Sequence, residues 1–361
     1  MEPSHLARRS IRRTRAGASC GACLGAEHNE QPLHPVLCQV RQPSIIFAVL
    51  LATVSTVAFP AYSADTLNSI VVPGERAYPE SISAAPDGTL YVSSLASGGI
   101  ARIKPGASKA EPWIKPGAFD SRSTLGVLVD ERSNLLWVCS NDMSGVGVPG
   151  PSSIPGSFLK GFDLATGEGK VSAALPGSHN LCNDMTIAAD SSLYVTNSRA
   201  PQILRLKADR KELEVWLEDK QFDPPKGGVG LDGIAIGGDG NIYLNTFTKG
   251  EFFRVEMREG RPGNVTRLKT SRPLTLPDGL RPLSDRTFLM AEGGGTLDRV
   301  SIAGHKVTIE SLRDGLAEPT AVAKVGETAW VAEGQLSHLS NPATNGPPRL
   351  PFRITGVPVG P

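Results

Sequence analysis

A short two-stranded pattern recurs along this chain and constrains its fold more than any other feature. Each copy has an apolar alternating strand, a turn, and a second strand with an aromatic residue near its start. The copies begin at Glu80, Leu125, Asn183, Asp232, Asp278 and Glu318. These positions are 45, 58, 49, 46 and 40 residues apart, which is the spacing of repeated β-sheet units. Asp87-Gly88 and Asp239-Gly240 fall between paired strands, where glycine supplies the positive φ of a tight hairpin.

Repeats of this length with four short strands each predict a β-propeller. We expect residues 65–361 to form an all-β, six-bladed β-propeller with four antiparallel strands per blade. Residues 69–72 and 349–354 are expected to pair, so that the N- and C-terminal strands close the ring. An open solenoid of the same units is the alternative, but both ends of the repeat region read as strands and not as polar caps.

The first 64 residues have the composition of a leader. Residues 45–58 are uncharged and apolar but shorter than a membrane span of about 20 residues. Arg41 precedes this run and small residues follow it up to Ala64, the order of a secretory signal peptide. We expect a signal peptide at 40–64, after a non-native or disordered extension at 1–39, with Val40 as the true initiator. These features predict a periplasmic or secreted protein that has no stable membrane anchor after the signal peptide is cleaved. A single anchor helix is the alternative.

The charge balance excludes a broad nucleic-acid-binding face. Lys and Arg number 37 against 36 Asp and Glu, a formal net charge of +1, while 40% of residues are hydrophobic. Phosphate contacts need a cationic excess, and this apolar fraction is too high for a disordered chain. We therefore expect no nucleic-acid partner. We also expect a monomer whose partner is a small-molecule substrate.

The residues that begin the repeats are the candidates for chemistry. In a propeller the first strand of each blade lines the central channel, so these residues meet at one mouth. Five of the six carry side-chain oxygens and four are acidic, with no Lys or Arg at an aligned position. Crowded carboxylates repel one another, and a hard cation such as Ca²⁺, Mg²⁺ or Mn²⁺ would compensate. Turn-forming Asp-Gly pairs and solvated carboxylates are the alternatives.

These landmarks resemble the SMP-30/gluconolactonase/LRE-like family of six-bladed propellers. That family carries, in order, a Glu, an Asn often followed by Asp, an Asn-Gly and a Pro-Asp-Gly. The matching positions here are Glu80, Asn183-Asp184, Asp232-Gly233 and Pro277-Asp278-Gly279. The chain departs from the pattern twice: Ser81-Ile82 follows Glu80 where the family has Gly-Pro and Trp, and Asp232 replaces an Asn.

The resemblance implies a metal-dependent hydrolase of a sugar lactone or related cyclic ester. It assigns the metal, with Ca²⁺ ahead of Mg²⁺, Mn²⁺ or Zn²⁺, to Glu80, Asp232 and Asp278. The general base would be Asp278 or Asp184, and Asn183 would orient the substrate. A non-catalytic small-molecule or protein-binding propeller with a structural metal is the alternative, and a lyase or condensing enzyme is a third.

Two further polar residues are substrate-binding candidates. His179 lies four residues before Asn183, and an exposed loop histidine is its alternative. Asn245 ends a second strand, as do Asn197, Glu292 and Glu333. These strand-end side chains would form either a second ring at the mouth or ordinary strand-end hydrogen bonds.

An insertion and two cysteines are also expected on the face of the propeller where the channel mouth lies. Residues 141–157 are rich in Gly, Pro and Ser, and form either a lid over the site or a surface loop of variable length. Cys139 and Cys182 should lie on this face in neighbouring blades. A disulfide is expected in an oxidising compartment, with two buried free thiols as the alternative.

Overall fold

The computed structural model describes residues 69–209 and 211–360. The extension predicted at 1–39 and the signal peptide predicted at 40–64 lie outside the described residues. Within the described part, no helix has the length and apolar character needed to cross a membrane. Strands dominate, which agrees with the all-β prediction.

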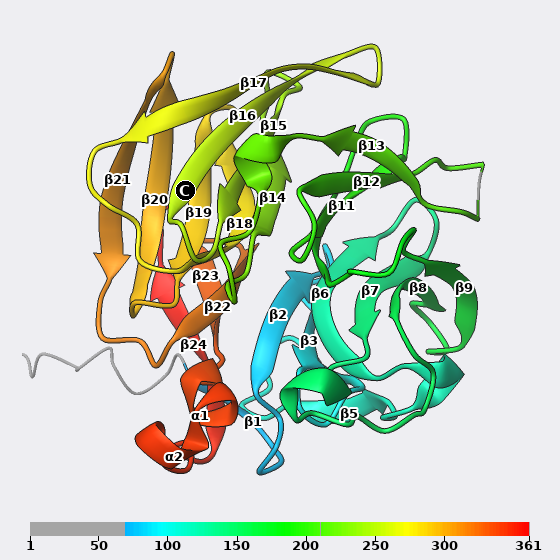
Figure 1. Ribbon diagram of the computed structural model, residues 1–361. Coiled ribbons are helices and arrows are strands. Elements are labelled where there is room, and N and C mark those ends of the chain that lie inside the picture. Colours follow the sequence, from blue (N-terminus) through cyan, green and yellow to red (C-terminus); the bar gives the residue numbers. More distant parts are fainter. Residues whose placement is uncertain (1–68, 210, 361) are drawn as a thin grey trace, which may run out of the picture. The chain divides into compact units, whose positions relative to one another are not determined.

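Most of the strands follow one another in groups of four antiparallel strands, and the first three sheets are built in chain order (Figure 1). The first sheet contains β2 (Pro79–Ala84), β3 (Leu90–Ser94), β4 (Ile100–Ile103) and β5 (Glu111–Ile114). The second contains β6 (Ser123–Asp130), β7 (Leu135–Asn141), β8 (Ser157–Asp163) and β9 (Gly169–Ala174). The third contains β10 (Cys182–Ile187), β11 (Leu193–Asn197), β12 (Gln202–Leu206) and β13 (Glu214–Glu218).

The next two groups of four strands are joined at their outer edges. One contains β14 (Leu231–Ile236), β15 (Ile242–Thr246), β16 (Glu251–Arg258) and β17 (Arg261–Thr270). The other contains β18 (Pro277–Ser284), β19 (Thr287–Glu292), β20 (Thr296–Ala303) and β21 (Lys306–Arg313). A short parallel pairing of β17 with β21 makes them one eight-stranded sheet.

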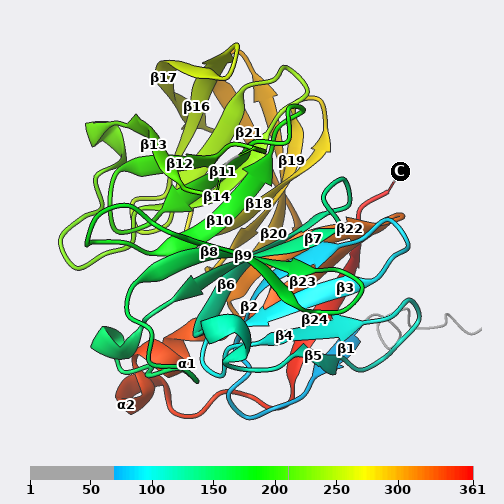
Figure 2. The ribbon, with the colours of Figure 1, turned by 90° about the vertical axis from the view of Figure 1, so that its right-hand side faces the viewer.

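The last sheet combines both ends of the described chain. It contains β22 (Pro319–Val325), β23 (Thr328–Glu333), β24 (Phe352–Pro358) and β1 (Ser69–Val72). β1 pairs antiparallel with β24, from Ser69 opposite Thr355 to Val72 opposite Phe352. The predicted pairing of the two terminal strands is therefore present. Two short helices, α1 (Leu336–Ser340) and α2 (Pro342–Asn345), follow β23 and precede β24 in the chain, and they lie next to each other (Figure 2).

The sheets meet through their first strands and through aromatic side chains. Each first strand lies beside the first strand of the next sheet, and β22 lies beside β2. Several of the recurring aromatics of the second strands are buried packing residues. Within the third sheet, Tyr194 packs edge-on against Trp216 at 4.8 Å between ring centroids. Tyr243 of β15 packs against Phe288 of β19, in the neighbouring group of four strands, at 5.0 Å.

The hairpin turns have the predicted conformation. Gly88 and Gly240 adopt φ of +87° and +76°. The Asp before each glycine accepts a hydrogen bond from the backbone N–H two residues on, at 2.8 Å for Asp87 and 3.1 Å for Asp239. These Asp-Gly pairs therefore make turns, and they lie apart from the acidic residues that begin the first strands.

Candidate functional site

The first strand of every sheet contains the same irregularity. In β2, Pro79 pairs with Ser94 and regular pairing resumes only at Ile82. The bulge in between turns Glu80 out of the ladder. The residues at the equivalent bulge positions are Glu80, Leu125, Asn183, Asp232, Asp278 and Thr320. A shared backbone defect therefore aims these side chains in a common direction.

The last of these residues corrects the sequence alignment, which placed Glu318 in this set. Glu318 precedes Pro319, as Tyr78 precedes Pro79 and Leu276 precedes Pro277, and all three have positive φ, of 50°, 39° and 53°. The equivalent of Glu80 is therefore Thr320, two residues later. The Glu318 carboxylate instead accepts hydrogen bonds from the backbone N–H and the hydroxyl of Ser337 at the start of α1.

A cavity of about 560 Å³ opens above these residues. Four of the predicted site residues line it together, namely Glu80, Asn183, Asp232 and Asp278. We call these four residues the polar floor. Each of them is at most 6% exposed. The structure thus brings together side chains from four first strands, β2, β10, β14 and β18, that are far apart in the sequence.

The three carboxyl groups of the floor resist ionisation. Burial raises the pKa of Asp232 to about 8, opposed by hydrogen bonds with Asp278 and Asn183. Burial also raises the pKa of Glu80 and of Asp278 well above their usual range, and the charge of Asp232 raises both further. Desolvation and like-charge repulsion act in the same direction here. The floor favours either bound protons or a compensating cation.

Arg281 supplies a cation that the sequence alignment did not anticipate. Its guanidinium binds both carboxylate oxygens of Asp184, at 2.6 Å and 2.8 Å. Asp184 also accepts the backbone N–H of Ile234 at 3.3 Å. Arg281 opposes the rise in the pKa of Glu80. It lies three residues after Asp278, outside the aligned positions, so comparison of those positions alone could not reveal it.

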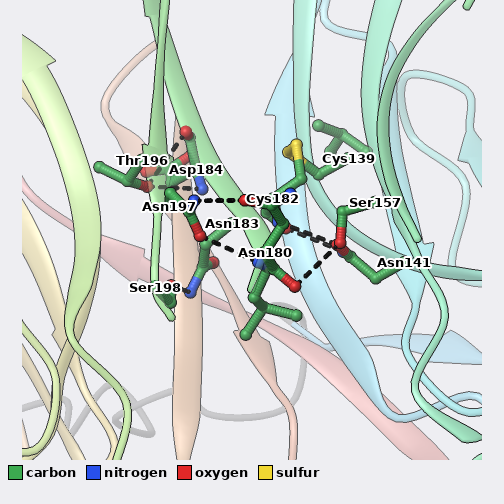
Figure 3. Close-up of a disulfide and its surroundings, with 12 residues drawn as sticks. Cys139, Asn141, Ser157, Asn180, Cys182, Asn183, Asp184, Thr196, Asn197 and Ser198 are labelled. Carbon is green, nitrogen blue, oxygen red and sulfur yellow. Dashed lines mark hydrogen bonds between the residues drawn. A yellow bond between two sulfur atoms is a disulfide. The ribbon is translucent and has the colours of Figure 1, made fainter. Parts of the chain in front are cut away.

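Asp184 consequently does not line the cavity, although it neighbours the floor. Both of its carboxylate oxygens are occupied in the bidentate pair with Arg281. Such a pair is rigid and specific, which suits a positioning residue better than a general base. Asn183 lies beside it in β10 and donates its amide N–H to the Ser198 hydroxyl at 2.8 Å (Figure 3).

The other two substrate-binding candidates are not part of the cavity wall. His179 is exposed in the loop before β10 and is absent from the described lining residues. Asn245 is fully buried. Its amide oxygen accepts the Gly233 N–H at 3.1 Å, and its amide nitrogen donates to the Asp278 carbonyl at 2.7 Å. Asn245 therefore joins neighbouring first strands, the strand-end alternative.

The same backbone role is filled by the other strand-end residues. Asn197, Glu292 and Glu333 accept the backbone N–H groups of Leu181, Thr275 and Ala317, respectively. These N–H groups belong to the loops that lead into the first strands. Of the two alternatives, ordinary strand-end hydrogen bonds are therefore the ones present, and they hold those loops.

The insertion after β7 forms part of the cavity wall. Met143, Val146 and Val148 line the cavity. Arg122 holds the segment in place: its guanidinium donates to the carbonyls of Ile154 and Pro149. It also forms an ion pair of 3.0 Å with Asp142. A buried arginine with these partners makes the segment a fixed wall in this structure.

Cys139 and Cys182 form a disulfide with 5.1 Å between their Cα atoms (Figure 3). Both residues are fully buried. The Asn141 side chain adds two hydrogen bonds of 2.9 Å, to the carbonyl and from the N–H of Cys182. Because Asn183 follows Cys182 directly, these links fix one corner of the polar floor.

The floor has the donor chemistry of a hard-cation site. Three carboxyl groups and one amide are the ligand types that Ca²⁺ takes. One carboxyl oxygen of Asp232 is buried without a hydrogen-bond partner, which is an acceptor position that a cation would satisfy. As the side chains lie, however, no group of three or more His, Cys, Asp and Glu within 69–209 and 211–360 is arranged to hold a metal ion.

No protein-family model and no curated protein sequence matches this chain. Solved structures do. The major allergen Mala s 1 of Malassezia sympodialis is 14% identical and has a TM-score of 0.61, over 80% of this chain and 96% of that one. A gluconolactonase of Xanthomonas campestris is 14% identical with a TM-score of 0.55, over 81% and 95%. A virginiamycin B lyase of Staphylococcus aureus is 16% identical with a TM-score of 0.53, over 79% and 82%.

These similarities establish the fold. The chain is a β-propeller of the kind found among SMP-30/gluconolactonase-like proteins. The predicted resemblance is thus confirmed for the architecture. At these identities the comparisons do not assign an activity, because one fold supports different chemistries.

Proposed function

We propose that the protein is a hydrolase of a lactone or related ester that acts at the polar floor of the cavity. The observation that carries this proposal is the convergence of Glu80, Asn183, Asp232 and Asp278 in one cavity. Buried carboxyl groups with shifted pKa values are typical of catalytic sites. Gluconolactonases among the structural neighbours support the same reaction class.

We further propose six blades arranged in a closed ring. The pairing of β1 with β24 and the position of β22 beside β2 support closure. The Thr320 hydroxyl donates to the Pro79 carbonyl at 3.1 Å, and this hydrogen bond joins β22 to β2. A closed ring would give the floor a rigid support in which the bulged residues face a common axis.

Glu80, Asp232 and Asp278 would hold a divalent cation, with Ca²⁺ as the first candidate. When bound, such a cation supplies charge that polarises a substrate carbonyl and acidifies water. The unpartnered oxygen of Asp232 and the absence of Lys and Arg from the described lining residues support this assignment. The chain's own Arg281 serves the neighbouring Asp184 and leaves the three floor carboxyl groups without a direct ion pair among the described contacts.

Within this proposal the residues of the floor have separate tasks. Asp278 is the general base, because its carboxyl group is buried at the cavity floor beside the other polar residues of the site. Asn183 orients the substrate by its amide, which Ser198 holds in place. The ion pair of Asp184 and Arg281 positions the neighbouring floor residues, since Asp184 also accepts the backbone N–H of Ile234. The buried disulfide supports the proposed periplasmic or secreted location, because such bonds persist in oxidising compartments.

A lactone panel with and without a chelator tests the proposal. The purified protein should open at least one δ- or γ-lactone, lose most of that activity in EDTA and regain it with added Ca²⁺. Hydrolysis that EDTA leaves unchanged would refute the metal assignment but not the hydrolase. Failure to open any lactone or simple ester would refute the hydrolase.

A non-catalytic binding propeller is the second candidate. The raised pKa of both Asp232 and Asp278 favours it, because buried carboxyl groups that keep their protons need neither a metal nor a reaction. In that case the protein would bind small molecules in the same cavity without turnover.

A further inference from the structure

The walls of the cavity differ in chemistry from its floor. Apolar side chains line the cavity around the polar floor; they come from β6, from loops next to the first and second strands, and from α1. Examples in chain order are Leu95, Leu125, Leu181, Phe247, Leu276 and Leu336. The insertion after β7 adds Val146 and Val148. A ligand that reaches the floor must therefore pass between hydrocarbon surfaces on all sides.

Thr320, Glu318 and Ser337 of the wall are already engaged with the protein. The Thr320 hydroxyl lies 3.1 Å from the Pro79 carbonyl and 3.3 Å from the Ala332 carbonyl. The Glu318 carboxylate is bound to the backbone and hydroxyl of Ser337. Among the described residues of the lining, none is Lys, Arg or His.

This wall disfavours a sugar lactone. Each hydroxyl of such a ring would exchange water for an apolar neighbour, and an unsatisfied buried hydroxyl is costly. A hydrocarbon chain would instead gain from leaving water, in proportion to the apolar area that it buries. The wall therefore disfavours binding of a sugar lactone and favours binding of a lactone that bears a hydrocarbon chain.

The rim of the cavity is apolar as well. Val146 is 57% exposed and Leu276 is 38% exposed, two of the few large hydrophobic residues exposed in the described chain. Leu276 has φ of +53°, a backbone region that favours glycine or asparagine over leucine. An apolar side chain is thus present where solvent exposure and backbone conformation both favour another residue.

We propose that the substrate is a lactone or ester that bears a hydrocarbon chain. Its carbonyl lies on the polar floor and its chain lies between the apolar walls, towards Val146 and Leu276. The inference names the substrate class of the site proposed above and rests on that function for the bond that is broken. Opening the ring adds water across the acyl C–O bond and gives a hydroxy acid, with no further reactant.

A series of δ-lactones tests this proposal directly. δ-Valerolactone carries no chain, δ-decanolactone carries a five-carbon chain, and δ-gluconolactone presents hydroxyl groups instead. We expect kcat/KM to rise about three- to fourfold for each added methylene that the walls bury. δ-Gluconolactone should be the poorest substrate of the series. Calorimetry of each compound with the Asp278→Asn variant measures how much the wall contributes to binding affinity in the absence of turnover.

Rim variants locate the effect on the cavity. Leu276→Asn suits the positive φ and leaves the core intact, so the fold should be retained. Val146→Asn changes a second exposed rim residue. Each variant should lower kcat/KM for δ-decanolactone about three- to tenfold and change δ-valerolactone less than twofold. Val215→Asn is the matched control, because Val215 is 44% exposed on β13 and does not line the cavity.

The outcomes separate this inference from the proposed function. Turnover of δ-gluconolactone at or above that of δ-decanolactone would overturn the inference and leave the hydrolase intact. Chain-dependent binding without hydrolysis of any compound would support the apolar ligand and refute the hydrolase. If no compound is hydrolysed and binding does not strengthen with chain length, both the inference and the proposed function are overturned. Equal losses in the rim variants and in Val215→Asn would also overturn the inference.

Discussion

Arg281→Met should destabilise the protein strongly, because it removes one half of a buried ion pair. The side chains of Arg281 and Asp184 are 12% and 6% exposed, and two hydrogen bonds of 2.6 and 2.8 Å join them. Without the guanidinium, Asp184 keeps only the 3.3 Å contact with the Ile234 N–H. An unpaired buried charge of this kind costs about 3–5 kcal/mol of unfolding free energy.

Asp184 is also a charged neighbour that raises the pKa of Glu80, Asp232 and Asp278, so Arg281 offsets a charge that acts on the whole floor. The double variant Arg281→Met/Asp184→Asn removes the stranded charge and keeps an acceptor for the backbone. It should recover most of the loss, to within about 1 kcal/mol of the parent protein.

Urea unfolding at pH 7 measures both variants and yields the coupling energy of a double-mutant cycle. Arg258→Met is the control, because Arg258 is 72% exposed in its ion pair with Glu256. That exposed pair should contribute less than about 1 kcal/mol. A loss below about 1 kcal/mol for Arg281→Met, or a double variant no more stable than Arg281→Met, would contradict the role assigned to the pair.

Four further predictions concern other parts of the molecule. Calcium at 100 times its dissociation constant should stabilise the protein by about 2.7 kcal/mol; unchanged thermal unfolding in Ca²⁺ and in EDTA would contradict a bound cation. Burial and the neighbouring Glu292 raise the pKa of Asp298 to about 7, so the folded state binds more protons than the unfolded chain and stability should fall as pH rises from about 4 to 8. Asp298→Asn should flatten that slope in urea unfolding at pH 5 and pH 8, and an unaltered slope would exclude Asp298 as its source. Reduction of the Cys139–Cys182 bond, which spans 43 residues, should lower the unfolding free energy by about 2–4 kcal/mol, and equal stability with and without reductant would count against it. Arg122→Met removes the hydrogen bonds that hold the insertion, so limited proteolysis within 141–157 should become at least about tenfold faster, whereas an unaltered cleavage rate would show that other contacts hold the segment.

The hairpins and the shared orientation of the first strands were predictable because both follow from local patterns. Period-2 alternation and Asp-Gly turns identify paired strands wherever they occur. The convergence of Glu80, Asn183, Asp232 and Asp278 also followed, since equivalent positions in a repeat occupy equivalent places. The cysteine pair was predictable for the same reason.

What sequence reasoning missed depends on contacts between repeats. Glu318 was misplaced by two residues because an acidic residue drew the alignment, although the proline after it marks the correct register. Arg281 lies outside the aligned positions, and only the assembled sheets bring it to Asp184. Asn245 looked available for a ligand because a sequence does not show which backbone groups of the next sheet will saturate an amide.

The central claim is that the polar floor carries the reaction. The most direct test compares lactone hydrolysis by the Asp278→Ala variant with that by the Asp239→Ala variant. Asp278 lies in the polar floor, whereas Asp239 lies in a hairpin turn outside the described cavity lining. If the floor carries the reaction, Asp278→Ala should lower kcat by about 10²- to 10⁴-fold and Asp239→Ala should retain the parent rate. Full activity in Asp278→Ala, with the fold intact, would show that the reaction does not depend on this floor.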